Sequence, residues 1–337
     1  MLAWLILHSG IAAAGTWLAR RYALQRDLLD HPGERRSHAV ATPRGGGIAI
    51  VLALLVAAVA LALRDPSQGL LLAAFGIGVA LVAGVGMVDD HRPLSPWVRL
   101  LVHAAAGAVF ALAIQYVFGQ TWLSLLAFAS TAALTNIWNF MDGINGIAAT
   151  QALLLGVALA SMTTGSWMLV GLALAAACAG FLPFNFPRAR IFMGDVGSGA
   201  IGFAIAAVAV VAAGTQGFDA AWLLLPLSAF LVDAGFTLAR RMLRGEHWWQ
   251  PHVQHAYQVW ARRSGHAVVT LAYVAWTLLG LVGMTLFMGS SAIFMLCLCL
   301  AWYVFAALAW WVLQRLEVAR PDGARLTPGH GDPREDE

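Results

Sequence analysis

The chain is a series of apolar stretches of about twenty residues, the length that a helix needs to cross a bilayer. Of its 337 residues, 60% are apolar and 11% are charged, whereas soluble domains carry roughly 25% charged residues. A soluble protein of this length would lack the polar side chains to cover its surface, so we expect lipid to surround most of it. The pattern predicts an all-α polytopic membrane protein with about 10–11 transmembrane helices, near residues 1–22, 46–63, 69–88, 98–118, 121–140, 147–164, 166–184, 199–214, 220–239, 267–288 and 292–314.

Arginine, which supplies all 20 lysine-plus-arginine positions, orients these spans. If the loop after the first span is cytoplasmic, every arginine except Arg64 falls in a cytoplasmic segment, as the positive-inside rule requires. Asp65 and Asp219 are the only carboxylates assigned to the outer side. We therefore expect the N-terminus outside, the C-terminus in the cytoplasm and the functional loops on the cytoplasmic face.

Residues 1–320 are expected to form one integral membrane domain. Residues 321–337 are polar and rich in Pro and Gly, so we expect a disordered cytoplasmic tail. The net charge of +3 is small and spread over loops, which excludes nucleic acid as an expected partner. The apolar N-terminus lacks the basic segment and cleavage site of a signal peptide and is expected to be retained as the first span.

The first two cytoplasmic loops carry charged and flexible residues beside the membrane. His38 and Arg44 lie in the first loop, just before three glycines whose free N–H groups suit an anion, although contact with anionic headgroups is equally open. The second loop begins with Asp89-Asp90, two adjacent carboxylates that need a cation nearby at a membrane boundary. Arg99, at the start of the next span, can face the same space.

The third and fourth cytoplasmic loops supply hard oxygen atoms. Asn136 and Asn139 share one face of a helix end, and Asp142 and Asn145 follow, each directly before a glycine. Amide and carboxylate oxygens suit Mg²⁺, which takes a few protein ligands together with substrate phosphates. In the fourth loop Phe192 precedes Asp195 by three residues, an arrangement that suits a nucleotide or, alternatively, a simple Gly-rich helix start.

The fifth cytoplasmic loop is the longest and contains two closely spaced histidines. His252 and His255, at positions i and i+3, are expected to share a helical face and to contact phosphate or sugar oxygens. Trp248 and Trp249 are expected to be interfacial anchors. Asp233, inside the preceding span, must pair or line a cavity, and Arg240 or Arg241 is the expected partner.

Taken together, these loops resemble the polyprenyl-phosphate N-acetylhexosamine-1-phosphate transferase superfamily, glycosyltransferase family 4. The resemblance extends from Asp30 to Gln258 and depends on five motifs in the family's order. It implies that Asn139 and Asp195 hold Mg²⁺, with Mn²⁺ as the alternative ion. The other roles that it implies are acceptor and metal contacts for Asp89 and Asp90, pyrophosphate binding for Arg99, uracil stacking for Phe192, a base contact for Asn145, and the last-loop histidine motif for His252 and His255.

The resemblance also implies the reaction. An N-acetylhexosamine 1-phosphate would pass from a UDP-N-acetyl sugar to undecaprenyl phosphate in the bacterial inner membrane, with release of UMP. The last loop reads His-x-x-His-x-Tyr-Gln rather than a His-rich run. This departure resembles the branch that initiates O-antigen synthesis with QuiNAc or FucNAc, although GlcNAc stays open, and it suggests a role in lipopolysaccharide or other envelope polysaccharide synthesis.

Two other functions compete with the transferase. A lipid or lipid-linked sugar transporter would place ionisable groups near the bilayer midplane, where Asp233 is the one candidate. A catalytically inactive scaffold is the second rival, and the full set of acids disfavours it. We further expect an apolar groove for the prenyl chain that opens sideways into lipid near the Asp89 helix end. The sequence leaves homodimer formation open.

Overall fold

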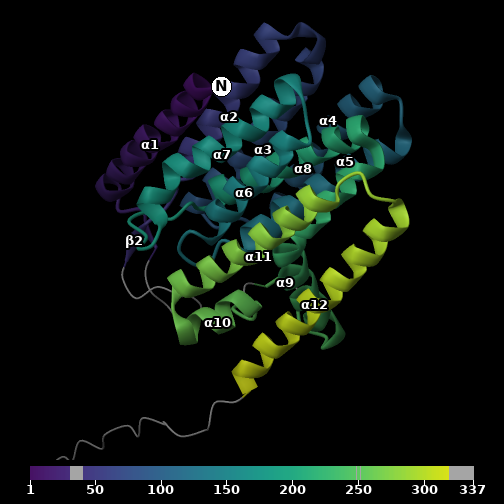
Figure 1. The fold of residues 1–337 in the computed structure, drawn as a ribbon. Coiled ribbons are helices and arrows are strands. Elements are labelled where there is room, and N and C mark those ends of the chain that lie inside the picture. Colours follow the sequence, from purple (N-terminus) through teal and green to yellow (C-terminus); the bar gives the residue numbers. More distant parts are fainter. Residues whose placement is uncertain (31–40, 248, 251, 319–337) are drawn as a thin grey trace, which may run out of the picture.

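A computed structural model describes residues 1–30, 41–247, 249–250 and 252–318. The predicted 321–337 tail, His38 and Trp248 lie outside the described residues. The chain is almost entirely helical (Figure 1). Its elements are α1 (Leu2–Gln25), β1 (Leu29–Asp30), β2 (Thr42–Pro43), α2 (Ile48–Arg64), η1 (Pro66–Gln68), α3 (Gly69–His91), α4 (Pro96–Phe118), α5 (Thr121–Phe140), α6 (Ile147–Ser161), α7 (Gly165–Asn185), α8 (Asp195–Gln216), η2 (Gly217–Leu223), α9 (Leu224–Leu243), α10 (Ala256–Ser264), α11 (His266–Phe287) and α12 (Ala292–Val318).

The eleven predicted spans correspond to α1–α9, α11 and α12, which confirms an all-α polytopic membrane protein. In the described part of the chain, eight segments are long and apolar enough to cross a membrane. One of them, Asp195–Leu243, contains both α8 and α9, and α2 and α6 are shorter apolar helices. The remaining helix, α10, is short and lies in the fifth loop.

The central helix is α8, which packs against α2, α3, α5, α6 and α7. Of the residues in its most apolar stretch, 89% are buried, and a helix that is apolar all round belongs in an interior. Small residues let its neighbours approach closely. A Cβ on Gly202 would lie 2.2 Å from the Leu134 carbonyl oxygen of α5, so only glycine fits at this crossing.

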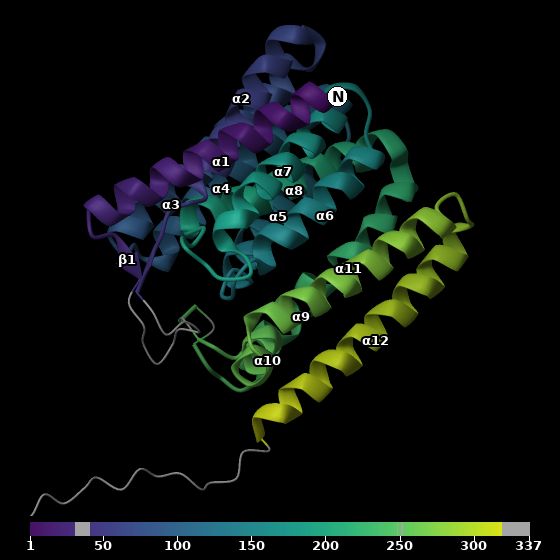
Figure 2. The ribbon, with the colours of Figure 1, turned by 60° about the vertical axis from the view of Figure 1, so that its left-hand side comes forward.

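The loops predicted to be cytoplasmic gather at one end of the bundle. β1, β2 and α10 lie at this end, and the N-terminus lies at the other (Figures 1 and 2). The β1–β2 pair joins Leu29 to Pro43 and Asp30 to Thr42 in antiparallel register. The chain after β2 then contacts the fourth loop, because Gly46 N–H donates to the Phe192 carbonyl oxygen at 2.9 Å. Two loops far apart in sequence are thereby joined.

Candidate active site

A polar cavity of about 200 Å³ lies at this end of the bundle. Its wall comes from β1, the residue after β2, the C-terminal ends of α3, α5 and α7, the N-terminal end of α8, the third and fourth loops and α10. The described lining residues are Asp30, Arg44, Asp90, Asn139, Asp142, Gly143, Ile144, Asn185, Phe192, Gly194, Asp195, Ser198 and Gln258. Six of the predicted site residues are therefore brought together: Arg44, Asp90, Asn139, Asp142, Phe192 and Asp195.

Asp90 connects the two central motifs of the site. Its side chain is 7% exposed, and its two carboxylate oxygens accept the backbone N–H groups of Asp195 at 3.1 Å and Val196 at 3.2 Å. These N–H groups have no partner inside α8, and the positive end of a helix favours a carboxylate. Gly194 has φ of +76°, and a Cβ there would lie 2.5 Å from Asp90 Oδ2. Asp90 therefore holds the start of α8, and with it Asp195, in place.

Arg99 joins the paired acids to Asp195. Its Nη1 atom lies 3.0 Å from Asp89 Oδ2 and 2.9 Å from Asp195 Oδ2. Asp89 also accepts the Leu94 backbone N–H through Oδ1 at 2.6 Å, which fixes its side chain. The expectation that Arg99 faces the same space as the aspartates is confirmed, and a guanidinium with five donors can add an anionic ligand to these contacts.

The polar cavity is strongly acidic. Among its described lining residues, the carboxylates of Asp30, Asp90, Asp142 and Asp195 outnumber the guanidinium of Arg44 by three. Burial raises the pKa of Asp142 well above its ordinary value, and the negative charges of Asp195 and Asp90 raise it further. A diphosphate is itself anionic, so a cation bound beside these carboxylates would reduce its repulsion from them.

The donor atoms fit a Mg²⁺ ion that is completed by a ligand. Among the described residues, no three His, Cys, Asp or Glu side chains converge in a metal-binding arrangement. Mg²⁺ is commonly held by only one or two carboxylates together with water and phosphate oxygens. Asn139 Nδ2 donates to Ser198 Oγ at 3.2 Å, which leaves the Asn139 amide oxygen for a cation beside Asp195.

Phe192 and Arg44 are placed by the contact between the first and fourth loops. Phe192 N–H donates to the Pro43 carbonyl oxygen at 2.8 Å, so the aromatic ring and the guanidinium of Arg44 lie on neighbouring, paired backbones. Both line the polar cavity and both are half-buried. The predicted neighbours Phe192 and Asp195 also line this cavity together, and the stacking role of Phe192 stays a prediction.

Two predicted ligand contacts have other partners. Asn145 Nδ2 donates to the Pro187 carbonyl oxygen at 3.0 Å, and Asn145 is not part of the described cavity wall. Its amide braces the fourth loop. Asn136 Nδ2 donates to the Ala132 carbonyl oxygen at 2.8 Å within α5 and lines a neighbouring apolar cavity instead. Asn139, one turn further along α5, lines both this cavity and the polar one.

The expected helical face of His252 and His255 is wrong, because α10 begins only at Ala256. The two rings still lie close, with centroids 4.8 Å apart, but His255 is 3% exposed and neither ring belongs to the described wall of the polar cavity. The expected pairing of Asp233 with an arginine is also wrong. Its carboxylate accepts the Ala256 and Tyr257 backbone N–H groups, while Arg241 pairs with Glu246 at 2.9 Å.

Four polar residues of the cavity wall carried no predicted role: Asp30, Asn185, Ser198 and Gln258. Ser198 follows Asp195 by three residues on α8, so helical spacing alone places it on the same face. Asn185 Oδ1 accepts the Gly146 N–H at 2.7 Å, and its Nδ2 donates to the Ile191 carbonyl oxygen at 2.9 Å. It thereby joins the third and fourth loops, and no local pattern indicates such a contact.

An apolar cavity of about 290 Å³ adjoins the polar one. Asn139 and Asp195 line both cavities, and Arg99 lies in the apolar wall. The other lining residues come from the end of α3 and from α4, α5, α8, α9 and the fifth loop, including Trp97, Leu100, Ala133, Gly235, Leu238 and Trp249. Trp249, expected as an interfacial anchor, packs against Trp97 with centroids 6.4 Å apart.

The sequence is similar to those of known proteins. A model of the family described as glycosyl transferase family 4 matches residues 72–213. Decaprenyl-phosphate N-acetylglucosaminephosphotransferase of Mycobacterium tuberculosis is 30% identical over 321 residues, covering 82% of this chain and 78% of that protein. Undecaprenyl-phosphate alpha-N-acetylglucosaminyl 1-phosphate transferase of Thermotoga maritima is 29% identical over 262 residues, covering 77% of this chain and 81% of that protein.

A third relative has a different named activity. Phospho-N-acetylmuramoyl-pentapeptide-transferase of Moorella thermoacetica is 34% identical over 226 residues, covering 58% of this chain and 69% of that protein. The fold and the site define a multi-pass membrane protein with a charged site at one end of its helix bundle. The chain belongs to glycosyl transferase family 4, which confirms the predicted resemblance.

Proposed function

We propose that this protein transfers an N-acetylhexosamine 1-phosphate from a UDP-sugar to undecaprenyl phosphate, with release of UMP. The observation that carries the proposal is the junction of the two cavities at Asn139 and Asp195. A UDP-sugar has polar groups and phosphates that suit the acidic cavity once a cation is present. A polyprenyl phosphate has an apolar chain that suits the adjoining cavity, and its phosphate would then meet the donor at the junction.

The chemistry is a displacement at phosphorus. A phosphate oxygen of undecaprenyl phosphate forms a bond to the sugar-bearing phosphorus, and the bond from that phosphorus to the UMP oxygen breaks, with its electron pair leaving on UMP. A phosphate monoester is largely ionised near neutral pH, its second pKa being about 6. Positioning and charge neutralisation therefore matter more than a base.

Each site residue has a task in this reaction. Asn139 and Asp195 would hold Mg²⁺, or Mn²⁺ in its place, and the ion would neutralise the pyrophosphate. Arg99 lies at the junction, where its guanidinium can bind the same phosphates. Phe192 would stack on uracil, and Arg44 would add a positive charge to the polar wall. Asp89 fixes Arg99, and Asp90 fixes Asp195 through the start of α8.

The rival transporter depended on Asp233 as a group that lines a path through the membrane. Its carboxylate instead accepts hydrogen bonds from the N-terminus of α10 and, at 2.8 Å, from the Tyr273 hydroxyl. We further propose that the charged end faces the cytoplasm of a bacterial inner membrane, with the N-terminus periplasmic. Supporting this, the loops at the charged end contain almost all the arginines.

The test is UMP release from UDP-GlcNAc, UDP-QuiNAc and UDP-FucNAc in detergent, with Mg²⁺ and undecaprenyl phosphate. We expect release with at least one of these donors, and an Asp195→Ala variant should lower it by about two to three orders of magnitude, the range of mutational losses for charge-stabilising groups. Asp219→Asn, which changes a carboxylate at the opposite end of the bundle, is the matched control. Release that persists in the Asp195→Ala variant, or no release with any donor, would refute the proposal. A role in O-antigen or other envelope polysaccharide synthesis would follow from the preferred donor.

A further inference from the structure

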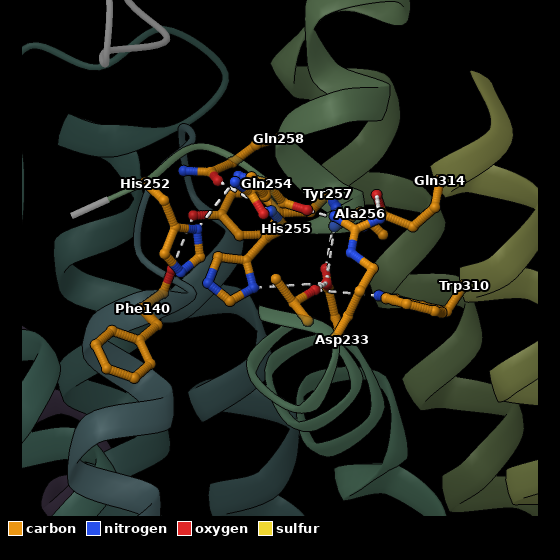
Figure 3. Close-up of polar contacts among 12 residues, drawn as sticks. Phe140, Asp233, His252, Gln254, His255, Ala256, Tyr257, Gln258, Trp310 and Gln314 are labelled. Atoms are coloured by element: carbon orange, nitrogen blue, oxygen red, sulfur yellow. Dashed lines mark hydrogen bonds and ion pairs between the residues drawn. The ribbon is translucent and has the colours of Figure 1, made fainter. Parts of the chain in front are cut away.

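Asp233 is a buried carboxylate of α9 that makes several contacts to one element. Its side chain is 2% exposed, Oδ1 accepts the Ala256 N–H at 2.7 Å, and Oδ2 accepts the Tyr257 N–H at 3.0 Å. His255 Nδ1 lies 3.6 Å from Oδ1 (Figure 3). The first N–H groups of a helix lack partners within the helix, and a carboxylate is well suited to them. Asp233 therefore anchors the N-terminus of α10 to the helix bundle.

The anchored end of α10 forms part of the polar cavity. Gln258 lines that cavity, and the Tyr257 hydroxyl donates to the Phe140 carbonyl oxygen at 2.9 Å, just before the third loop. The fit leaves no spare room, because a Cβ on Gly143 would lie 2.2 Å from the Tyr257 hydroxyl oxygen and 3.2 Å from Gln258 Nε2. A shift of α10 would therefore move both Gln258 and the loop that carries Asp142.

The last helix holds the same region from its other side. Gln314 of α12 donates from Nε2 to the Gln254 carbonyl oxygen at 2.8 Å, and its Oε1 accepts Arg240 Nη1 at 2.8 Å. Trp310 Nε1 donates to Thr237 Oγ1 at 3.2 Å, one turn along α9 from Asp233. Figure 3 shows Gln314 and Trp310 reaching from α12 toward this network. Buried polar contacts of this kind are costly to break, so they define one position for the segment.

We propose that Asp233 is a positioning residue for the transfer reaction, with Gln314 as a second anchor, and that Gln258 is the wall residue which they hold against the UDP-sugar. This inference rests on the proposed function. Asp233 itself touches no reacting atom. The amide of Gln258 can donate to and accept from polar groups of the nucleotide or sugar, so loss of the anchor should weaken donor binding more than it slows the chemical step.

The test compares Asp233→Asn with Val232→Ala in the full-length protein. Asparagine keeps the size of the side chain but replaces one acceptor with an NH₂ group that faces donors. Val232 is the adjacent residue on α9 and is 3% exposed, so its truncation weakens packing without removing a hydrogen bond to α10. In Asp233→Asn we expect the KM for the UDP-sugar to rise about tenfold with a smaller change in kcat. Amide hydrogen exchange across residues 252–260 should be about tenfold faster, a factor that corresponds to about 1.4 kcal/mol.

Two further variants separate the anchor from the wall. Gln258→Ala should raise the KM and speed exchange only at the His255 N–H, which Gln258 Oε1 accepts at 3.3 Å, whereas Gln314→Leu should speed exchange across residues 252–260. The inference is overturned if Asp233→Asn matches Val232→Ala in both KM and exchange, or if Gln258→Ala leaves the KM unchanged. Failure of the proposed function is recognised separately, because the wild-type protein would then release no UMP. Exchange in Asp233→Asn alone would then decide whether Asp233 anchors α10.

Discussion

Asp90→Asn distinguishes the roles of the two adjacent aspartates. Asp90 uses one oxygen for the Asp195 N–H and the other for the Val196 N–H. Asparagine retains one acceptor and turns an NH₂ group toward the other donor. A hydrogen bond to a charged group contributes about 1.5–3 kcal/mol, and a carboxylate at a helix N-terminus adds about 0.3–1 kcal/mol. We therefore expect the free energy of unfolding to fall by about 2 kcal/mol.

The matched variant is Asp89→Asn. The Asp89 side chain retains an acceptor for the Leu94 N–H but loses its ion pair with Arg99, which is 28% exposed. Partly exposed ion pairs contribute about 1 kcal/mol or less, so this variant should lose clearly less stability. Both variants should lose UMP release, Asp90→Asn because Asp195 moves and Asp89→Asn because Arg99 is no longer held.

The assay is thermal unfolding in detergent, followed by tryptophan fluorescence, beside UMP release for the same preparations. The Asp90 variant should melt at a lower temperature than the Asp89 variant, and both below the wild type. If Asp90→Asn has the melting temperature of the wild type but has lost UMP release, Asp90 acts on the substrate and does not hold α8. That result would refute our reading of the site.

Burial, with His255 and Arg241 as further causes, lowers the pKa of His252 from 6.5 to about 4. Between these two values the unfolded chain binds more protons than the folded one, so His252 contributes stability above pH 6.5 that is lost as the pH falls toward 4. In His252→Gln the melting temperature should therefore depend less on pH in this range. Gly235→Leu should raise the KM for undecaprenyl phosphate and leave the KM for the UDP-sugar unchanged, because a Cβ at Gly235 meets only open space in the apolar cavity. Gly10→Leu, at an equally open position on α1, is its control, and a KM that rises equally in both would contradict the assignment. Gly202→Val should prevent assembly of α8 against α5, read as loss of the monodisperse peak in size-exclusion chromatography. EDTA should abolish UMP release and lower the melting temperature of the wild type but not of Asp195→Ala, and equal melting shifts in both would contradict a Mg²⁺ ion at Asp195.

Most helix boundaries were predictable because lipid imposes a simple rule on composition. The predicted span 199–214 begins at Asp195, however, and the predicted span 220–239 begins at Leu224. Asp90 extends α8 by accepting its first N–H groups, and the turn η2 delays the start of α9. The contact that extends α8 comes from a residue 105 positions away, so hydropathy alone does not reveal it.

The candidate site divides in the same way. Asp89, Asn139 and Asp195 could be selected because charged and amide side chains are costly beside lipid. Asn145 and His255 belong to equally polar motifs, yet their side chains brace loops or are buried. The type of a side chain indicates that its burial beside lipid is unfavourable. Only its neighbours show whether a ligand or the protein itself provides the compensating contacts.

The sequence by itself determined that the chain crosses a membrane many times, that its charged loops share one face, and that those loops carry acids and amides suited to a metal and phosphates. These properties follow from composition and spacing, which each segment carries alone. The tertiary structure alone decided that Asp90 holds Asp195, that Gln258 enters the cavity wall, and that Asp233 and α12 hold α10. Such contacts join residues about 60 to 100 positions apart in the sequence, or residues that belong to different helices. Only the packing of the bundle brings them within hydrogen-bonding distance.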